Sequence, residues 1–282
     1  MAASLSRGTW LGLPAVLFIG VLYLAPVATL LASSLVATQP DGSRVLSLDA
    51  YRAFFGDSYS LTLLARTLAL SLCTVAASLA LAFPVALYLR RLPPARRTLV
   101  AMLLLSPLLT SVVVRTLAWV VILGPNGLLN NLLGWLGLSP IALIYNDLGV
   151  IIGLTHVFFG YMLLCLLTSV LKLDPAQLLA AANLGAGPWR QFRHVILPQC
   201  RPGIAAGAVL VFTMSASAYV TPVLMGGTQT KVMASEIYDL AISYLEWKEA
   251  AVVAAILFAV VWIVVGGISR TAAVPGRGEH GS

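Results

Sequence analysis

The sequence predicts an all-α integral membrane protein with six transmembrane helices. Of its 282 residues, 60% are hydrophobic and only 10% are charged, against roughly 25% charged in a soluble domain. The mean hydropathy is +0.95, and apolar runs of about 20 residues, the length that crosses a bilayer, recur along the chain. We therefore expect one membrane domain over residues 11–268, with short tails at 1–10 and 269–282.

The first two apolar runs cover residues 11–35 and 61–89, separated by a polar loop. Small residues near the end of the first run resemble a signal-peptide cleavage site. A signal core is only about 7 to 15 residues long, however, whereas this run is long enough to span a bilayer, which favours an uncleaved helix. The second run is followed by Pro93 and Pro94, which stand among four arginines within eight residues. Prolines end a helix and clustered arginines mark a cytoplasmic loop.

The third run stops at a turn-forming cluster, residues 124–127, and a segment without basic residues follows it as far as Asp147. Glycine, proline and asparagine in series favour a turn, and the lack of basic residues favours the extracytoplasmic side. The last four predicted spans are residues 98–123, 148–171, 202–225 and 250–268.

Basic residues fall on alternate loops of this six-helix arrangement. On one side there are eleven basic residues and two acidic ones, namely Arg7, Arg90, Arg91, Arg96, Arg97, Lys172, Arg190, Arg193, Arg201, Arg270 and Arg277 with Asp174 and Glu279. On the other side there are four basic residues, namely Arg44, Arg52, Lys231 and Lys248. Loops rich in lysine and arginine stay in the cytoplasm, so both termini are predicted to be cytoplasmic.

The chain carries no pattern typical of a catalytic or metal centre. Its three histidines, His156, His194 and His280, have no ligand spacing, and there is no serine-hydrolase, metalloprotease or nucleotide-binding motif. The cysteines lack paired spacing and are interpreted as structural thiols. We expect no cofactor and no metal, and any energy for transport must come from another subunit.

Two charges lie clearly inside the apolar runs, Arg66 and Arg115. Arg66 is close to the outer end of its run, so its guanidinium can extend to the interface. Arg115 lies nine residues before Gly124, or about 13 Å of helical rise. Its guanidinium must therefore extend to the distant membrane interface, pair with another polar group, or face a water-filled interior. Arg115 and Tyr219 are the candidates for a role in the solute pathway or in helix pairing.

The longest polar interruption covers residues 172–201 and is predicted to begin with a short helix. Asp174 suits the N-cap and is followed by proline at the first helical position. Gln177 has the spacing of a capping box. The helix should end near Leu184, with Gly185 in the left-handed conformation.

A second helix is predicted from Trp189, after a turn at Gly187 and Pro188, with an interruption at Pro198. We consider three interpretations of this pair of helices. The simplest is that it packs at the membrane surface, and the functional interpretation is that it docks a partner protein. A DNA-reading helix-turn-helix is the third, and its insertion between two membrane spans argues against it.

This stretch resembles the EAA loop of binding-protein-dependent ABC importer permeases, whose pattern is Glu-Ala-Ala, three residues, Gly, nine residues, an aliphatic residue, any residue, then Leu-Pro. The chain departs from the pattern at Leu179, where relatives have glutamate, and at Ala182, where arginine is frequent. The matching residues are Ala180, Ala181, Gly185, Val195, Leu197 and Pro198.

Two further segments resemble the spermidine/putrescine permease branch of that family. Residues 106–130 are similar to its third-helix region, including Arg115, Trp119 and Asn130. Residues 222–227 are similar to the exit of its fifth helix.

The resemblance implies a type I ABC importer permease fold with a cytoplasmic coupling helix between the fourth and fifth transmembrane helices. It also implies a bacterial inner-membrane subunit that hydrolyses no ATP itself. The expected partners are a second permease subunit in a heterodimer, two ATPase subunits, a periplasmic solute-binding protein, membrane lipid and a small-molecule solute, with no nucleic acid. The residues expected to dock the ATPase are Leu179, Ala180, Ala181, Leu184, Gly185 and Pro198.

The solute class is less well specified. The outer loops carry eight acidic residues against four basic ones, which suits a cation such as a polyamine but equally suits simple solvation or docking of the binding protein. Amino acids, iron chelates and organic anions stay open. An alternative from another class is a stand-alone channel or ion-coupled transporter with six helices.

Overall fold

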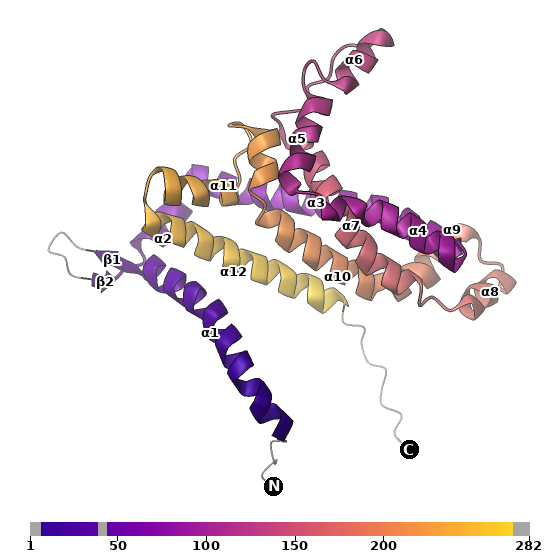
Figure 1. Ribbon diagram of the computed structural model, residues 1–282, viewed down its shortest axis with the longest axis horizontal. Helices are drawn as coiled ribbons and strands as arrows, with labels where there is room; N and C mark the ends of the chain where they lie inside the picture. Colours follow the sequence, from indigo (N-terminus) through magenta and orange to yellow (C-terminus); the bar gives the residue numbers. More distant parts are fainter. Residues whose placement is uncertain (1–6, 39–43, 273–282) are drawn as a thin grey trace. The chain divides into compact units, whose positions relative to one another are not determined.

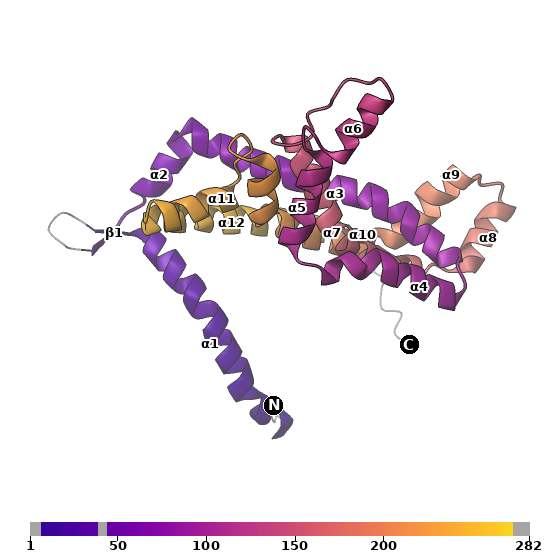
Figure 2. The ribbon, with the colours of Figure 1, turned by 45° about the horizontal axis from the view of Figure 1, so that its top comes forward.

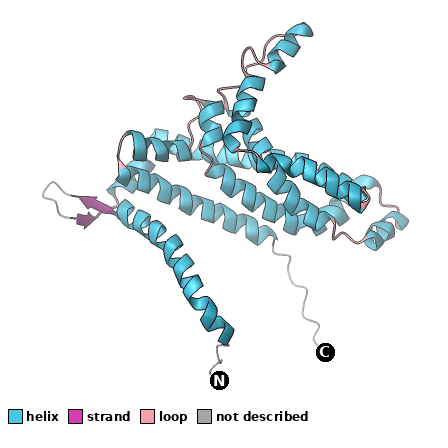
Figure 3. Cartoon of the chain, in the orientation of Figure 1, coloured by secondary structure: helices cyan, strands magenta, loops and turns pink. Residues whose placement is uncertain are grey.

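The computed structural model describes residues 7–38 and 44–272, which are almost entirely helical (Figure 3). The predicted tails lie largely outside these residues, as do Asp41, Arg277 and Glu279. The elements, in chain order, are α1 (Arg7–Leu35), β1 (Val36–Thr38), β2 (Arg44–Leu46), α2 (Asp49–Gly56), α3 (Ser58–Arg91), α4 (Pro94–Leu105), η1 (Ser106–Leu109), α5 (Val112–Leu123), α6 (Leu128–Trp135), α7 (Asp147–Val170), α8 (Pro175–Asn183), α9 (Pro188–Gln191), η2 (Phe192–Ile196), α10 (Leu197–Ala216), η3 (Pro222–Gly226), α11 (Met233–Tyr238), η4 (Asp239–Ser243) and α12 (Trp247–Ala272).

The described residues contain six helical stretches that are long and apolar enough to cross a membrane. This confirms the predicted all-α membrane class. The chain divides into two compact units, residues 1–61 with 236–258 and residues 62–235 with 259–282.

The first unit contains α1, a two-stranded antiparallel pair and α2. Val36 pairs with Leu46 across the strands. The hydroxyl groups of Ser34 and Tyr51 are 2.7 Å apart, which ties the end of α1 to α2. The Tyr59 hydroxyl donates to Glu236 Oε2 at 3.0 Å.

The second unit is built around α7, more than half of which is buried. Helices α7 and α10 lie side by side along much of their length (Figures 1 and 2). Gly203 and Gly207, four residues apart on α10, allow this approach. A Cβ built on Gly203 would meet the Cys165 carbonyl oxygen at 2.7 Å, and one built on Gly207 would meet the Met162 sulfur at 2.5 Å. Small residues at this spacing let two membrane helices pack closely.

The third predicted span is wrong as a single helix. Helix α4 ends at Leu105, a 3₁₀ turn follows, and α5 begins at Val112 in a direction that turns away from the line of α4 (Figures 1 and 2). Pro107 explains the break, because its ring removes a backbone donor and clashes with the preceding turn. The stretch in this region that is long enough to span a membrane covers residues 112–135 and includes the turn between α5 and α6.

The predicted interruption at Pro198 is also wrong. The helical stretch runs from Pro188 to Ala216 without a break. Residues Phe192–Ile196 form a π-helical turn, in which the Leu197 N–H donates to the Phe192 carbonyl. The widened turn makes room for the ring of Pro198, two residues after Ile196, so the helix adapts to the proline instead of ending at it.

Candidate functional site

Helix α8 is closed at both ends by its own sequence. The Asp174 carboxylate accepts a hydrogen bond of 2.8 Å from the Ala176 N–H, with Pro175 at the first helical position. At the other end Gly185 has φ +77° and donates to the Ala182 carbonyl at 2.9 Å, while Ala186 donates to the Ala181 carbonyl at 3.0 Å. These two bonds form a Schellman motif, which ends a helix abruptly. The predicted N-cap and left-handed glycine are confirmed.

The capping-box role of Gln177 is not confirmed. Its side-chain oxygen accepts a hydrogen bond of 3.0 Å from Gln199 Nε2, so it turns toward α10 and away from the N-cap. A partner 22 residues further along the chain therefore outcompetes the local backbone donor. The bond joins α8 directly to the membrane helix that follows it.

The face of α8 that points away from the other helices, together with the turn after it, is apolar and exposed. Leu179 and Leu184 expose 65% and 87% of their surface, Ala180 is exposed, and Ala181 is half-buried. Pro198 is also half-buried, at the beginning of α10. We call Leu179, Ala180, Leu184 and Gly185 the coupling face. Exposed leucines on a short polar loop are typical of a surface that another protein covers.

The segment that carries α8 is fastened at its base to the membrane helices. Arg90, at the end of α3, donates from Nη2 to the carbonyl of buried Leu173 at 2.9 Å. Phe192 packs edge-on against Phe83 at 5.3 Å between ring centroids, and Trp189 stacks on Phe192. Figures 1 and 2 show α8 and α9 together at one end of the second unit. Sequence reasoning counted Arg90 only as a cytoplasmic charge and missed that it anchors this segment.

Arg66 is paired near the beginning of α3. Its Nη1 donates to the Gln229 carbonyl at 2.8 Å, and its Nε lies 3.8 Å from the Asp147 carboxylate. The guanidinium thus reaches the beginning of α7 and the loop after η3, as extension toward the interface predicts.

Arg115 is placed very differently, because 92% of its surface is buried. Its Nη1 lies 3.5 Å from the Val157 carbonyl oxygen, which is the long limit for a hydrogen bond. Val157 is ten residues from one end of α7 and thirteen from the other, or about 15 Å and 20 Å of helical rise. The guanidinium is therefore near the middle of a transmembrane helix. Arg115 neither extends to the interface nor pairs with an acid within the described residues.

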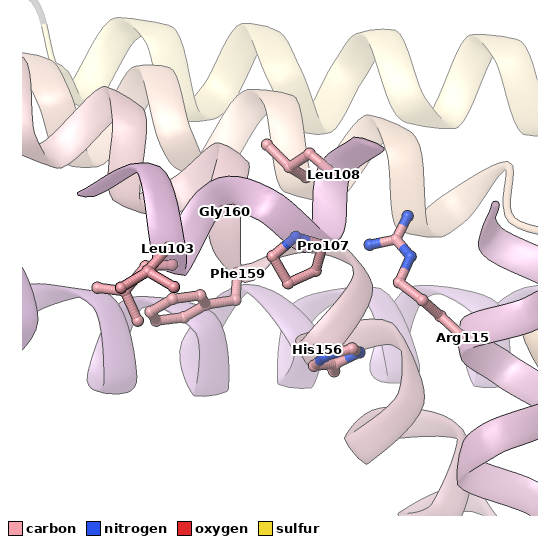
Figure 4. A pocket seen from close by; sticks show the side chains of 8 residues that line it. Leu103, Pro107, Leu108, Arg115, His156, Phe159 and Gly160 are labelled. Atoms are coloured by element: carbon pink, nitrogen blue, oxygen red, sulfur yellow. The ribbon is translucent and has the colours of Figure 1, made fainter. Parts of the chain in front are cut away.

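The guanidinium of Arg115 lines a cavity of about 240 Å³ between α4, η1, α5 and α7. In Figure 4 it extends from α5 toward Pro107 and Leu108, and the ring of His156 faces the same space. The indole of Trp119 packs edge-on against that ring at 5.5 Å. Among the described residues, Tyr219 is not part of the lining. It lies in the turn after α10, so the structure does not bring the two candidates into one site.

The model of the family "Binding-protein-dependent transport system inner membrane component" matches residues 1–277. The chain belongs to this family. It is accordingly a multi-pass permease subunit of an ABC importer.

Two relatives and one solved structure illustrate the match. The spermidine/putrescine transport system permease PotB of Escherichia coli (strain K12) is 32% identical over 209 residues, covering 73% of this chain and 76% of the relative. PotB of Haemophilus influenzae is 28% identical over 229 residues, with 79% and 80% covered. The structure of a bacterial alginate ABC transporter in complex with an alginate pentasaccharide-bound periplasmic protein superposes with a TM-score of 0.77 at 18% identity, over 94% and 93% of the two chains. This last similarity concerns the fold.

Proposed function

We propose that the chain forms half of the solute pathway of this importer, and that α8 transmits the movement of an ATPase subunit to the membrane helices. The observation that carries the proposal is the construction of α8. It presents exposed leucines outward and is bonded inward to α10 through Gln199 and, at its base, to α3 through Arg90. The chain itself hydrolyses no ATP.

Coupling of this kind needs a rigid connection. A force that an ATPase subunit exerts on the coupling face is transmitted to α10 through the Gln177–Gln199 hydrogen bond. It is transmitted to α3 through the hydrogen bond between Leu173 and Arg90. Because α10 packs closely on α7, these helices shift together. Closure of the ATPases would then rock the pathway between its inward-open and outward-open states.

The partners proposed are a second, homologous permease subunit, two ATPase subunits and a periplasmic solute-binding protein. A periplasmic protein is bound in the alginate transporter structure, which supports the last of these. The bias of eleven basic residues to four supports placing α8 and both termini in the cytoplasm.

The solute proposed is a polyamine or a related small amine, on the strength of the PotB relatives. The acidic outer loops give weaker support, because several of their carboxylates have local partners. Asp57 binds the first turn of α3, Asp147 lies near Arg66, and Glu236 accepts from Tyr59.

Gly185 provides the test of coupling, with Gly187 as a matched control. Both glycines lie in the same loop and neither has an atom within 4 Å of a built Cβ, but φ is +77° at Gly185 and −65° at Gly187. A side chain at Gly185 costs about 1–2 kcal/mol of left-handed strain, whereas Gly187 accepts one freely. We expect Gly185→Glu to reduce spermidine-stimulated ATP hydrolysis by the reconstituted complex about tenfold or more, and Gly187→Glu to retain most of it.

The measurement is ATPase activity of the full complex in proteoliposomes, with and without spermidine-loaded binding protein. Membrane insertion of both variants should match wild type. Equal stimulation of the two variants would contradict the role of α8. If wild type responds to another solute but not to spermidine or putrescine, only the polyamine assignment fails. Solute uptake by the chain without ATPase subunits would favour the stand-alone transporter.

A further inference from the structure

The Arg115 cavity contains a positive charge that no acidic side chain of its described lining balances. Arginine stays protonated in proteins, so burial cannot be relieved by loss of a proton. The guanidinium has five N–H donors, yet its Nε is buried without a hydrogen-bond partner and its Nη1 reaches one carbonyl at 3.5 Å. A buried charge with so few contacts is strongly disfavoured unless an opposite charge joins it.

The helix that carries Arg115 increases the positive potential. Arg115 is the fourth residue of α5, a helix of 12 residues whose first turn contains no acidic residue. The beginning of a helix carries a partial positive charge and favours an anion. Ser111, at the N-cap position, makes no capping hydrogen bond through its side chain. The positive charge that lines the cavity is that of Arg115 itself.

The remaining walls define what the cavity accepts. Leu103, Leu108 and Phe159 are apolar, and His156 is the second polar side chain of the lining. Its ring faces the cavity (Figure 4), and an imidazole always carries at least one N–H that can donate. An anion with at least two oxygens matches the fork of a guanidinium, which binds carboxylates and phosphate-type groups through paired hydrogen bonds. Low dielectric around the site strengthens such contacts.

We propose that the Arg115 cavity is a binding site for a small oxyanion of the carboxylate or phosphonate class. Arg115 is its principal binding residue, and His156 is a second donor. The proposal does not depend on the identity of the transported solute. The oxyanion comes either from solution, where it would neutralise Arg115 in a pathway for cations, or from the anionic end of a transported solute.

The test uses the full permease–ATPase complex in nanodiscs of phosphatidylcholine, which contain no anionic lipid. Acetate or methylphosphonate replaces chloride at constant ionic strength while the melting temperature of the permease is followed. For wild type we expect a saturable rise in melting temperature. Arg115→Gln should weaken the apparent affinity for the oxyanion about tenfold to a hundredfold. Arg115→Lys keeps the charge but loses the paired N–H donors of the guanidinium, so its affinity should lie between those of wild type and Arg115→Gln.

The matched control is Arg66→Gln, because Arg66 already has Gln229 and Asp147 as partners. This variant should keep the wild-type response to acetate. A second expected signature is a crossover. Without oxyanion, Arg115→Gln should be at least as stable as wild type, since an uncompensated charge is removed, whereas with saturating acetate wild type should be the more stable. An arginine with a purely structural role would not produce this reversal.

Two results would overturn the proposal: no saturable response in wild type, or the same response in Arg115→Gln. The first is also expected if a carboxylate of the second permease subunit already occupies the cavity. ATP-driven accumulation of the bound oxyanion in proteoliposomes would identify it as part of the solute, and binding without accumulation would identify it as a solution ion. ATP hydrolysis measured on the same sample reports separately on the proposed function.

Discussion

At the scale of single residues, Asp57 shows how one side chain starts a membrane helix. Its carboxylate accepts hydrogen bonds from the Ser60 hydroxyl at 2.7 Å, the Ser60 N–H at 3.0 Å and the Tyr59 N–H at 3.3 Å. These bonds satisfy donors that the first turn of α3 leaves open. The Ser60 hydroxyl and then the backbone N–H groups lower the pKa of Asp57 below its ordinary value.

The lowered pKa of Asp57 predicts a local dependence on pH. A carboxyl group whose pKa is lower in the folded chain stabilises the fold above its unfolded pKa of about 3.9, and the contribution is lost as pH falls through the folded value. We expect the protection of the Tyr59 and Ser60 amides from hydrogen exchange, measured relative to their intrinsic exchange rates, to fall below about pH 4 in wild type. Asp57→Asn keeps an acceptor without a charge and should remove the pH dependence. An unchanged pH profile in the variant would contradict this role.

Predictions about single residues succeeded where the conformation of the residue is set by its neighbours in the sequence. Asp174 and Gly185 follow from backbone chemistry within a few residues, and the structure has both as expected. Gln177 failed because its partner, Gln199, is distant in sequence. Arg115 was singled out as unusual from its place in an apolar run, but its cavity depends on how α4, η1, α5 and α7 come together, which no short pattern encodes.

At the scale of elements, the α7–α10 pair is the framework to which α8 is bonded. Gly203 and Gly207 face Cys165 and Met162 on α7 so closely that a side chain on either would displace its neighbours. The glycine pair at this spacing is visible in the sequence and typical of close helix packing. Sequence reasoning nevertheless missed it, because the apolar run alone was enough to predict a span.

Gly203→Val should therefore disrupt this pair, because its Cβ would collide with the backbone carbonyl of Cys165, which cannot move as a flexible side chain would. We expect overpacking to cost about 1–3 kcal/mol or more, seen as a lower melting temperature of the purified complex. The control is Gly266→Val on α12, where nothing lies within 4 Å of a built Cβ. Equal melting temperatures for the two variants would refute the packing role.

The two element boundaries that sequence reasoning misplaced both involve proline. Pro107 separates α4 from α5, whereas Pro198 is absorbed by a π-helical turn and the helix continues. The same residue type thus has opposite outcomes. Whether a helix widens or breaks depends on the packing around it, here α7 for both segments, and that information is absent from the local sequence.

At the scale of the whole molecule, the number of membrane-spanning stretches could be predicted from the apolar runs of the sequence, but the arrangement of the helices could not. Six stretches long enough to cross a bilayer were expected and are present within the described residues. The third is formed differently from the prediction, because α5 leaves the direction of α4. Orientation across the membrane rests on the distribution of charge, since the bias of lysine and arginine toward the cytoplasm operates during insertion.

Orientation is tested by labelling single cysteines in a variant whose three native cysteines are replaced by alanine. Ser139→Cys, in the exposed loop after α6, and Gly187→Cys, in the exposed turn after α8, lie on opposite sides of the predicted bilayer. A membrane-impermeant maleimide should label Ser139→Cys in intact spheroplasts and Gly187→Cys only after permeabilisation. The reverse pattern would invert the topology and remove α8 from the reach of any cytoplasmic ATPase. The coupling proposal would then fail with it, because a helix outside the cell cannot receive work from ATP hydrolysed within.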